Sequence, residues 1–214
     1  MNYSDDILQL ATTATIWICW CIVHSLLNSD GIIAKAFPRG HPVRPYYRLL
    51  YSIGSVITLM LAYWITPLDN HKPLWTWNGP MWALQGACWV VALALGYLSF
   101  RLINIWNFFG LTALGIGRSG KESSNELLTS GIYGETRNPQ FLAGLLLLWA
   151  RDLTRTGLVI NIILSLYLLA GARVEEKRLS KKFGDEYSLY MSRVPRFIPK
   201  RIPPLRSLFR VQTR

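Results

Sequence analysis

The sequence predicts an all-α, polytopic membrane protein of about five transmembrane helices, the last two forming a helical hairpin. Hydrophobic residues make up 51% of the 214 residues. Several long runs lack formally charged side chains, and Trp and Tyr gather near their ends, as they do at membrane interfaces. This composition is too apolar for an ordinary soluble domain. We therefore interpret residues 1–214 as a single integral membrane domain.

The first three spans follow from the charge-free runs. Residues 7–27 carry no formally charged residue over 21 positions, which is enough to cross a bilayer core at about 1.5 Å per residue. The preceding MNYSDD has no basic residue, so this run is expected to be a retained span rather than a signal peptide. Residues 49–66 and 80–100 give the second and third spans. The loop at 28–47 contains three prolines, which prevent a continuous helix.

The second half of the chain is less regular. Residues 101–136 begin apolar but are interrupted by Asn and Gly, so they either prolong the third span or lie along the interface. Residues 141–150 are too short to span alone. Residues 151–156 are polar and predict the turn of a hairpin, whose second arm begins near Gly157 and runs on through Leu179.

The charge distribution predicts the orientation. The net charge is +11, and seven basic residues without an acid lie between Arg193 and Arg214. Beside apolar spans, such a tail indicates a cytoplasmic face near anionic lipid rather than nucleic-acid binding. We expect the N-terminus outside and the C-terminus in the cytoplasm, with the Arg151 and Arg155 turn as the exception to the positive-inside rule. The scattered His and Cys residues predict no metal site and no disulfide framework.

Residues 129–199 contain the motifs from which the function is predicted. They read TSGIYGETRNPQFLAG, two apolar blocks, and RVEEKRLSKKFGDEYSLYMSRVPRFIP. Polar and charged residues flank a hydrophobic hairpin, which is costly near a membrane unless they bind something. We expect residues 1–128 to supply the first spans and loops, residues 129–199 a cytoplasmic cofactor-binding core, and residues 200–214 a basic tail.

The spaced elements GIY, RNP with a following aromatic residue, EE, FG, EY and VPRFIP resemble the isoprenylcysteine carboxyl methyltransferase family. This family includes phospholipid methyltransferases and bacterial thiol methyltransferases. The resemblance, strongest over residues 127–199, implies methyl transfer from S-adenosylmethionine bound on the cytoplasmic side. The cofactor contacts that it implies are Asn125, Glu126, Leu127, Leu128, Tyr133, Asn138, Pro139, Gln140, Phe141 and Glu175. Two of these depart from the family motif, in which Asn138 is a histidine and Phe141 a tyrosine.

These residue types suit that cofactor. Arg137 can grip a carboxylate bidentately, Glu175 or Glu176 can accept from the ammonium or ribose, and Tyr133 or Phe141 can pack on adenine. Arg173 is a candidate for favouring an ionised acceptor, so Arg137 and Arg173 are the predicted catalytic residues. Of the EE pair, Glu175 is favoured for the site, and Glu176 is expected on a solvated helix turn.

The predicted function is methyl transfer to a lipophilic or small thiol, carboxyl or amine acceptor that enters from the bilayer. The prenylcysteine enzymes have a substrate-binding arginine where this chain has Gly171, which weakens the case for a prenylcysteine. A nicotinamide-dependent membrane reductase of the sterol reductase type, which carries a related motif, is one alternative. A non-catalytic membrane scaffold is another. The resemblance to bacterial proteins indicates the bacterial inner membrane.

Overall fold

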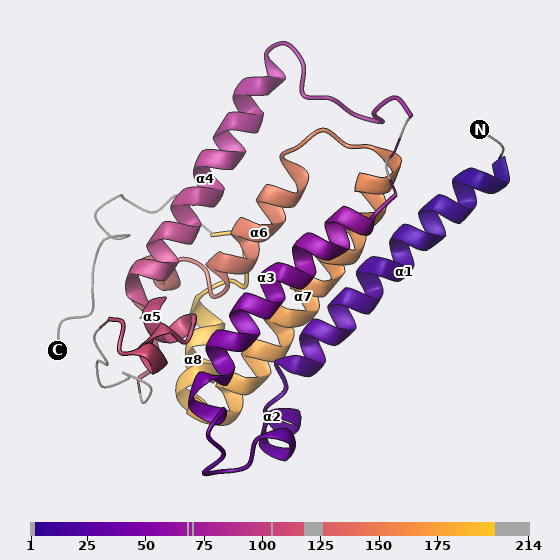
Figure 1. The fold of residues 1–214 in the computed structure, drawn as a ribbon. Helices are drawn as coiled ribbons and strands as arrows, with labels where there is room; N and C mark the ends of the chain where they lie inside the picture. Colours follow the sequence, from indigo (N-terminus) through magenta and orange to yellow (C-terminus); the bar gives the residue numbers. More distant parts are fainter. Residues whose placement is uncertain (1–2, 68, 70, 104, 118–125, 200–214) are drawn as a thin grey trace. The chain divides into compact units, whose positions relative to one another are not determined.

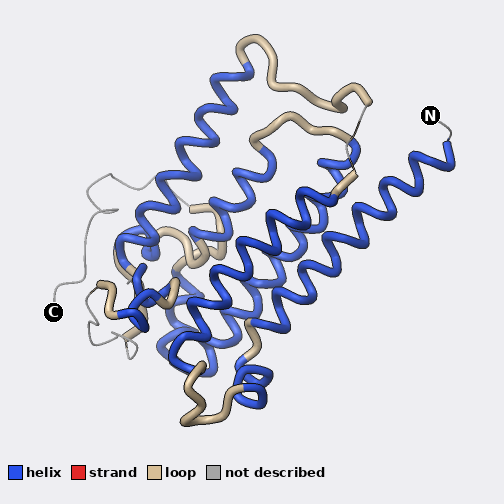
Figure 2. Tube along the Cα trace, viewed as in Figure 1, coloured by secondary structure: helices blue, strands red, loops and turns tan. Residues whose placement is uncertain are grey.

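The structure, a computed structural model, describes residues 3–67, 69, 71–103, 105–117 and 126–199. The described part of the chain consists of helices and the segments that join them (Figure 1), and Figure 2 draws no strand in it. This confirms the predicted all-α architecture. The basic tail at 200–214 and most of the polar loop at 117–126 lie outside the described residues.

Four described helices are long and apolar enough to cross a membrane. They are α1 (Tyr3–Leu27), α3 (Tyr47–Ile65), α4 (Met81–Leu102) and α7 (Arg155–Phe183). The fifth apolar helix, α6 (Pro139–Trp149), has 11 residues. At about 1.5 Å per residue it is about 17 Å long, roughly half of a bilayer core. The apolar block predicted at residues 141–150 is therefore part of a short helix. Among the described helices, four and not five have the length of a span.

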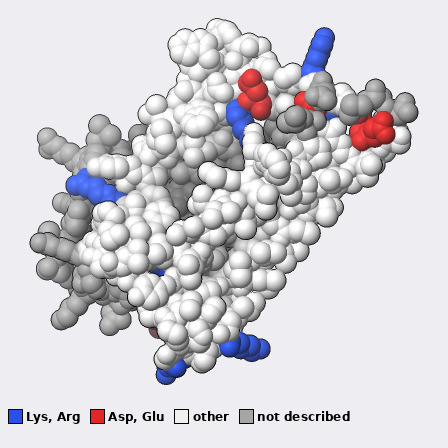
Figure 3. Space-filling view, viewed as in Figure 1, with Lys and Arg blue, Asp and Glu red and all other residues white. Residues whose placement is uncertain are grey.

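The surfaces of the long helices are apolar. Trp64 on α3 is 81% exposed and Val90 on α4 is 67% exposed, and Figure 3 shows few charged side chains along the visible helices. Large exposed apolar surfaces are unfavourable in water. These helices therefore have the surface of a multi-pass integral membrane protein.

The chain forms two compact units. The first contains α1, α2 (Asp30–Ala36), α3, α5 (Ile105–Phe108) and the start of α7. The second contains α4, α6, the rest of α7 and α8 (Asp185–Arg193).

Polar pairs join α1 to α3 in the first unit. The indole of Trp17 donates to Thr66 Oγ1 at 3.0 Å. Further along the same two helices, His24 Nε2 and the Tyr51 hydroxyl form a hydrogen bond of 2.8 Å. In an apolar environment such pairs hold two helices at a fixed register, because each polar group would otherwise lack a partner.

The segment after α4 is not an extension of that helix. Residue Ile103 is extended (φ −106°, ψ 143°), and the chain then forms α5 and a 3₁₀ turn at Leu111–Leu114. Gly110 has φ +77°, and a Cβ there would lie 2.5 Å from the backbone nitrogen of Leu49. The close approach requires glycine and packs this segment against the start of α3.

A polar network lies at the start of α7 in the first unit. The carboxylate of Asp69 accepts from the Thr156 amide at 3.1 Å and pairs with His71 Nδ1 at 3.0 Å. Asp6 pairs with His71 at 3.3 Å and with Arg155 at 3.2 Å. Carboxylates at a helix N-terminus satisfy amides that have no partner within the helix. The network therefore ties α1, Asp69 and His71 to the start of α7.

The core of the second unit lies between α4 and α6. It is built from small and aliphatic residues of α4, α6 and the 3₁₀ turn at Gly131–Gly134, namely Ala92, Leu95, Leu98, Ile132 and Ala143. At the end of α6, the carbonyl of Ala150 accepts from the Trp89 indole at 2.7 Å and from Gln85 at 3.2 Å. Side chains of α4 thus satisfy a carbonyl that the short helix leaves without an intrahelical partner.

The predicted hairpin joins α6 to α7, with α7 beginning at Arg155. Within the second unit, the Trp149 indole donates to Ser165 Oγ at 3.0 Å. After α7, Gly184 (φ +53°) reverses the chain so that α8 packs back against the end of α7. Tyr187 and Tyr190 of α8 are buried there with Leu127.

Replacing Asp69 by Asn should destabilise the protein by about 1 kcal/mol at neutral pH, as loss of a helix cap does. Burial opposes the charge of Asp69, but hydrogen bonds from the Thr156 and His71 amides and from the His71 side chain lower its pKa from 3.8 to about 2. Because the folded pKa lies below the ordinary value, the stabilisation is complete above about pH 4 and is lost as the pH falls towards 2. Thermal unfolding in detergent measures the difference between wild type and Asp69→Asn. A difference that stayed constant over this pH range, or one matched by the exposed Glu186→Gln, would contradict the assignment.

Candidate functional site

The candidate site is built where the GIY and RNP elements meet α7 and the VPRF segment in the second unit. Pro139 occupies the first turn of α6, where its fixed φ and missing N–H suit a helix start. Asn138 precedes it with φ −128° and ψ 58°, outside the helical region, as expected for a residue before proline. The sequence Arg137-Asn138-Pro139 therefore defines the start of α6.

A buried carboxylate on α7 holds this start in place. Glu176 is 5% exposed. Its Oε1 accepts from Arg137 Nε at 3.1 Å and from Asn138 Nδ2 at 2.9 Å, and its Oε2 accepts from Arg196 Nη2 at 2.7 Å. A buried carboxylate is tolerated only when charge and hydrogen bonds compensate for lost hydration. Glu176 thus joins α7, the start of α6 and the C-terminal segment.

Main-chain hydrogen bonds reinforce this junction. The amides of Arg137 and Asn138 donate to the carbonyls of Pro195 and Arg196 at 3.0 and 3.1 Å. Thr136 Oγ1 also donates to the Arg196 carbonyl, at 3.1 Å. Two segments almost sixty residues apart therefore run side by side, and the VPRF element packs against the RNP element.

The expectation for Glu176 was wrong. The sequence suggested a solvated helix turn, but Glu176 is buried between two arginines. At about 100° per residue, Glu176 follows Ala172 on one face of α7, and Ala172 is fully buried. Glu175 lies on the neighbouring face, is half-buried, and forms no hydrogen bond or ion pair with any described residue.

The two predicted catalytic arginines occupy different environments. Arg137 is 10% exposed in its side chain, and Nη1 donates to the carbonyls of Met191 and Val194 at 2.9 and 3.0 Å. With Glu176 on Nε, its donors are largely used within the protein. Arg173 is exposed on α7, about 160° around the helix from Glu175. The structure does not bring Arg173 to the other predicted residues.

Tyr133 lies on the 3₁₀ turn at Gly131–Gly134. The Tyr133 hydroxyl shares a side-chain hydrogen bond with Ser99, and its carbonyl accepts from the Tyr190 hydroxyl at 2.6 Å. Burial raises the pKa of Tyr133 well above its ordinary range, the Ser99 hydrogen bond opposes this shift, and the charge of Glu175 adds to it. Tyr133 is therefore a neutral hydrogen-bonding group that also carries an aromatic ring.

Two buried polar atoms near the GIY and RNP elements have no partner in the described part of the chain. They are Gln140 Nε2, on the first turn of α6, and Ser130 Oγ, before the GIY turn. Buried donors without partners cost free energy and are uncommon in folded proteins. Together with the available carboxylate of Glu175, they are groups that a polar ligand can satisfy.

The other predicted cofactor residues are placed as follows. The ring of Phe141 lies over Gly171 of α7, and Pro139 is buried at the start of α6. Leu127 is buried against α8, Glu126 is exposed, and Leu128 is half-buried. Asn125 lies outside the described residues.

Sequence reasoning missed Arg196 and Ser130, and it did not predict that Arg137 pairs with Glu176. The spacing of Ala172 and Glu176, one helical turn apart, was the available indication that Glu176 faces inward. Arg196 had no local indication, because its position depends on a pairing with residues almost sixty positions away.

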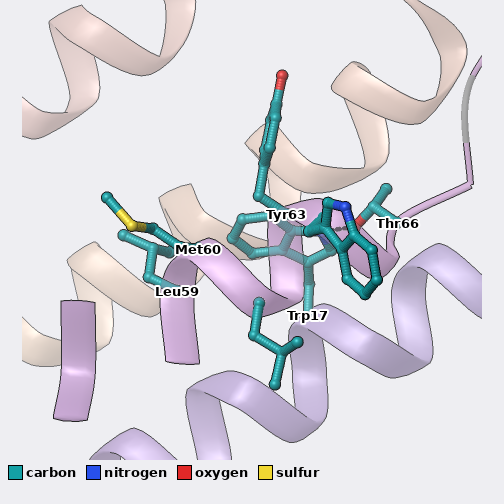
Figure 4. Close-up of a pocket in the computed structure, with 7 residues that line it drawn as sticks. Trp17, Leu59, Met60, Tyr63 and Thr66 are labelled. Carbon is teal, nitrogen blue, oxygen red and sulfur yellow. Dashed lines mark hydrogen bonds between the residues drawn. The ribbon is translucent and has the colours of Figure 1, made fainter. Parts of the chain in front are cut away.

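A large apolar hollow lies in the first unit. Its volume is about 860 Å³, and Figure 4 shows Trp17, Met60 and Tyr63 among the side chains that line it. No charged side chain lines it. Among the described residues, no group of three or more His, Cys, Asp or Glu side chains could hold a metal ion.

Curated proteins similar to this chain are named methanethiol S-methyltransferases. Methanethiol S-methyltransferase 1 of Bradyrhizobium diazoefficiens is 29% identical over 168 residues, which are 74% of this chain and 56% of that protein. The Pseudomonas deceptionensis protein is 28% identical over 199 residues, 90% of this chain and 73% of that protein. The Crocosphaera subtropica protein is 27% identical over 166 residues, 73% of this chain and 62% of that protein.

The chain therefore spans less than two thirds of the Bradyrhizobium and Crocosphaera proteins. No protein-family model and no solved structure matches it. The similarities confirm the predicted resemblance to bacterial thiol methyltransferases.

Replacing Glu176 by Gln should lower the free energy of unfolding by about 3–5 kcal/mol, because it leaves Arg137 buried without its counter-charge. Glu175→Gln is the matched control, one residue away on the same helix, and should change stability by less than about 1 kcal/mol. Thermal and denaturant unfolding in detergent compares them. Equal effects of the two substitutions would show that the buried network does not hold the fold.

Proposed function

We propose that the chain is an S-adenosylmethionine-dependent methyltransferase of the isoprenylcysteine carboxyl methyltransferase type, and that its acceptor is a small thiol. The observation that supports this proposal is that the two glutamates of the EE pair have different environments. Glu176 fixes the RNP segment against α7, while Glu175, Gln140 and Ser130 keep polar groups that have no hydrogen-bond partner among the described residues. The names of the similar proteins supply the acceptor class.

The residues present fit the cofactor. The carboxylate of Glu175 accepts hydrogen bonds only, which suits an ammonium or ribose hydroxyls. The buried amide of Gln140 donates to a carboxylate or a ring nitrogen, and Ser130 supplies a hydroxyl. Tyr133 offers an aromatic face for a purine. In this proposal Asn138, Pro139 and Phe141 hold the first turn of α6 that carries Gln140.

Arg137 acts in this proposal as a positioning residue. Its guanidinium binds Glu176 and the carbonyls of Met191 and Val194, so a direct contact with a cofactor carboxylate would require it to leave one of them. Asn138, which replaces the histidine of the family motif, donates to Glu176. An imidazole nitrogen can donate in the same way, which explains how asparagine fulfils this role.

The chemistry requires alignment more than acid–base catalysis. Bound S-adenosylmethionine supplies a methyl group on a positively charged sulfur. The acceptor thiol loses its proton to solvent, and its sulfur forms the new bond to the methyl carbon as the old carbon–sulfur bond breaks and its electron pair stays on the departing sulfur. The protein's contribution is to hold the reactants in line and exclude water. Arg173, exposed on the far side of α7, is not needed for this step.

We place the site on the cytoplasmic side of the bacterial inner membrane, with the N-terminus outside. The basic residues of the VPRF segment and of the following tail support this orientation. Arg155, an exception to the positive-inside rule in this orientation, pairs with Asp6 at 3.2 Å. That pairing offsets its charge and removes one objection to the assignment.

Calorimetry on detergent-purified protein tests the cofactor. S-Adenosylhomocysteine should bind with micromolar affinity, Glu175→Gln should weaken binding about 10- to 100-fold through loss of a charge-assisted hydrogen bond, and NADPH should not bind. Methyl transfer to methanethiol, followed as dimethyl sulfide, tests the acceptor. Binding of NADPH alone would favour the reductase, and binding of neither nucleotide would favour the non-catalytic scaffold.

Gln140→Met should weaken S-adenosylhomocysteine binding about 3- to 10-fold, the value of one neutral hydrogen bond. The unfolding temperature should not fall, because Gln140 Nε2 has no hydrogen-bond partner among residues 126–199 or elsewhere in the described part of the chain. The exposed Ser188→Ala is the control for binding. A fall in unfolding temperature with unchanged affinity would assign Gln140 to the fold instead.

A further inference from the structure

The helices α6 and α7 make two close contacts where they pack against each other. A Cβ added at Gly171 would lie 3.0 Å from Phe141 Cε1, and one added at Gly144 would lie 3.1 Å from Leu168 Cδ1. At both positions a large side chain of one helix lies directly on the backbone of the other. The two helices therefore approach closely, with Ala143 and Ala172 buried nearby.

Phe141 lies next to the groups assigned to the cofactor. It follows Gln140 on the first turn of α6, and its partner Gly171 precedes Glu175 by one turn of α7. Four residues of helix correspond to about 6 Å. The Phe141 ring therefore lies between these polar groups and the apolar part of α7 that precedes Gly171.

Leu168 makes the second close contact, on the preceding turn of α7. It lies almost one turn before Gly171, and its side chain packs closely against Gly144 of α6. An alkyl chain leaving the polar groups along this line would meet first the ring of Phe141 and then the side chain of Leu168. Close-packed contacts of this kind resist the insertion of additional methylene groups.

We propose that Phe141, held across Gly171, is a specificity-determining residue that restricts the methyl acceptor to short alkyl thiols. This inference rests on the proposed function and assigns the size limit of its acceptor to one side chain. A one-carbon thiol needs no space beyond the ring. A longer thiol has to displace a ring that packs directly on a helix backbone.

Chain-length profiles test the proposal. Methyl transfer to methanethiol, ethanethiol and butanethiol is measured for wild type, Phe141→Ala and the milder Phe141→Leu. Wild type should prefer methanethiol. In Phe141→Ala the ratio of kcat/KM for butanethiol to that for methanethiol should rise about 10-fold or more, since each methylene accommodated in an apolar site contributes substantially to binding.

Two further variants test whether the position of the Phe141 ring sets the size of the acceptor. Gly171→Ala adds a methyl group 3.0 Å from the ring and should push it outwards, which should lower the ratio of ethanethiol to methanethiol turnover. Leu166→Ala, at a position 63% exposed on the same helix, should leave the profile unchanged. Calorimetric binding of S-adenosylhomocysteine confirms that each variant keeps its folded site.

The outcomes separate this inference from the proposed function. A broadened profile in Phe141→Ala and a narrowed one in Gly171→Ala support the inference. Methanethiol turnover with the same chain-length profile in wild type and both Phe141 variants overturns it and leaves the proposed function standing. Cofactor binding without turnover of any thiol overturns both the small-thiol acceptor and the inference.

Discussion

The second unit depends on one buried carboxylate with two guanidinium partners. Glu176 is buried on α7 and accepts hydrogen bonds from Arg137, Asn138 and Arg196. Without these donors the carboxylate would be buried at a high free-energy cost, and without the carboxylate Arg137 would be buried unpaired. Each group is tolerable only because the others are present. The start of α6, the end of α7 and the VPRF segment therefore fold against one another as a set.

The same constraint explains how two adjacent glutamates differ in role. Neighbouring residues on a helix are about 100° apart, so they cannot face the same partner. Glu176 faces inward with Ala172 and is used by the fold, while Glu175 is half-buried and its carboxylate has no hydrogen-bond or ion-pair partner among the described residues. In the proposed function, the inner glutamate holds the scaffold rigid and the outer one binds the ligand. Rigid support of this kind is what precise alignment of two reactants requires.

The sequence predicted the long helices well because hydropathy depends on composition over about twenty residues and not on packing. It predicted the short α6 for the same reason. It did not predict which glutamate is buried, because that depends on the rotational phase of α7, and the mixed sequence RVEEKR obscures that phase. Nor could it predict the pairing of Arg137 and Asn138 with Pro195 and Arg196, since no local pattern encodes contacts across almost sixty residues. The segment after α4 remained ambiguous because an apolar run with glycines suits either an interfacial or a spanning helix.

The short α6 creates the conditions for a site of this kind. A helix of about 17 Å cannot cross a core of about 30 Å, so at least one end lies within the apolar layer if it is inserted upright. Its end groups must then find partners in the protein. Trp89 and Gln85 supply them at Ala150, and at Asn138 the Arg196 carbonyl and the Glu176 carboxylate do so. Polar groups are thereby kept beside apolar helices. In the proposed function, this arrangement allows a water-soluble cofactor and an acceptor dissolved in the bilayer to reach the same first turn of α6.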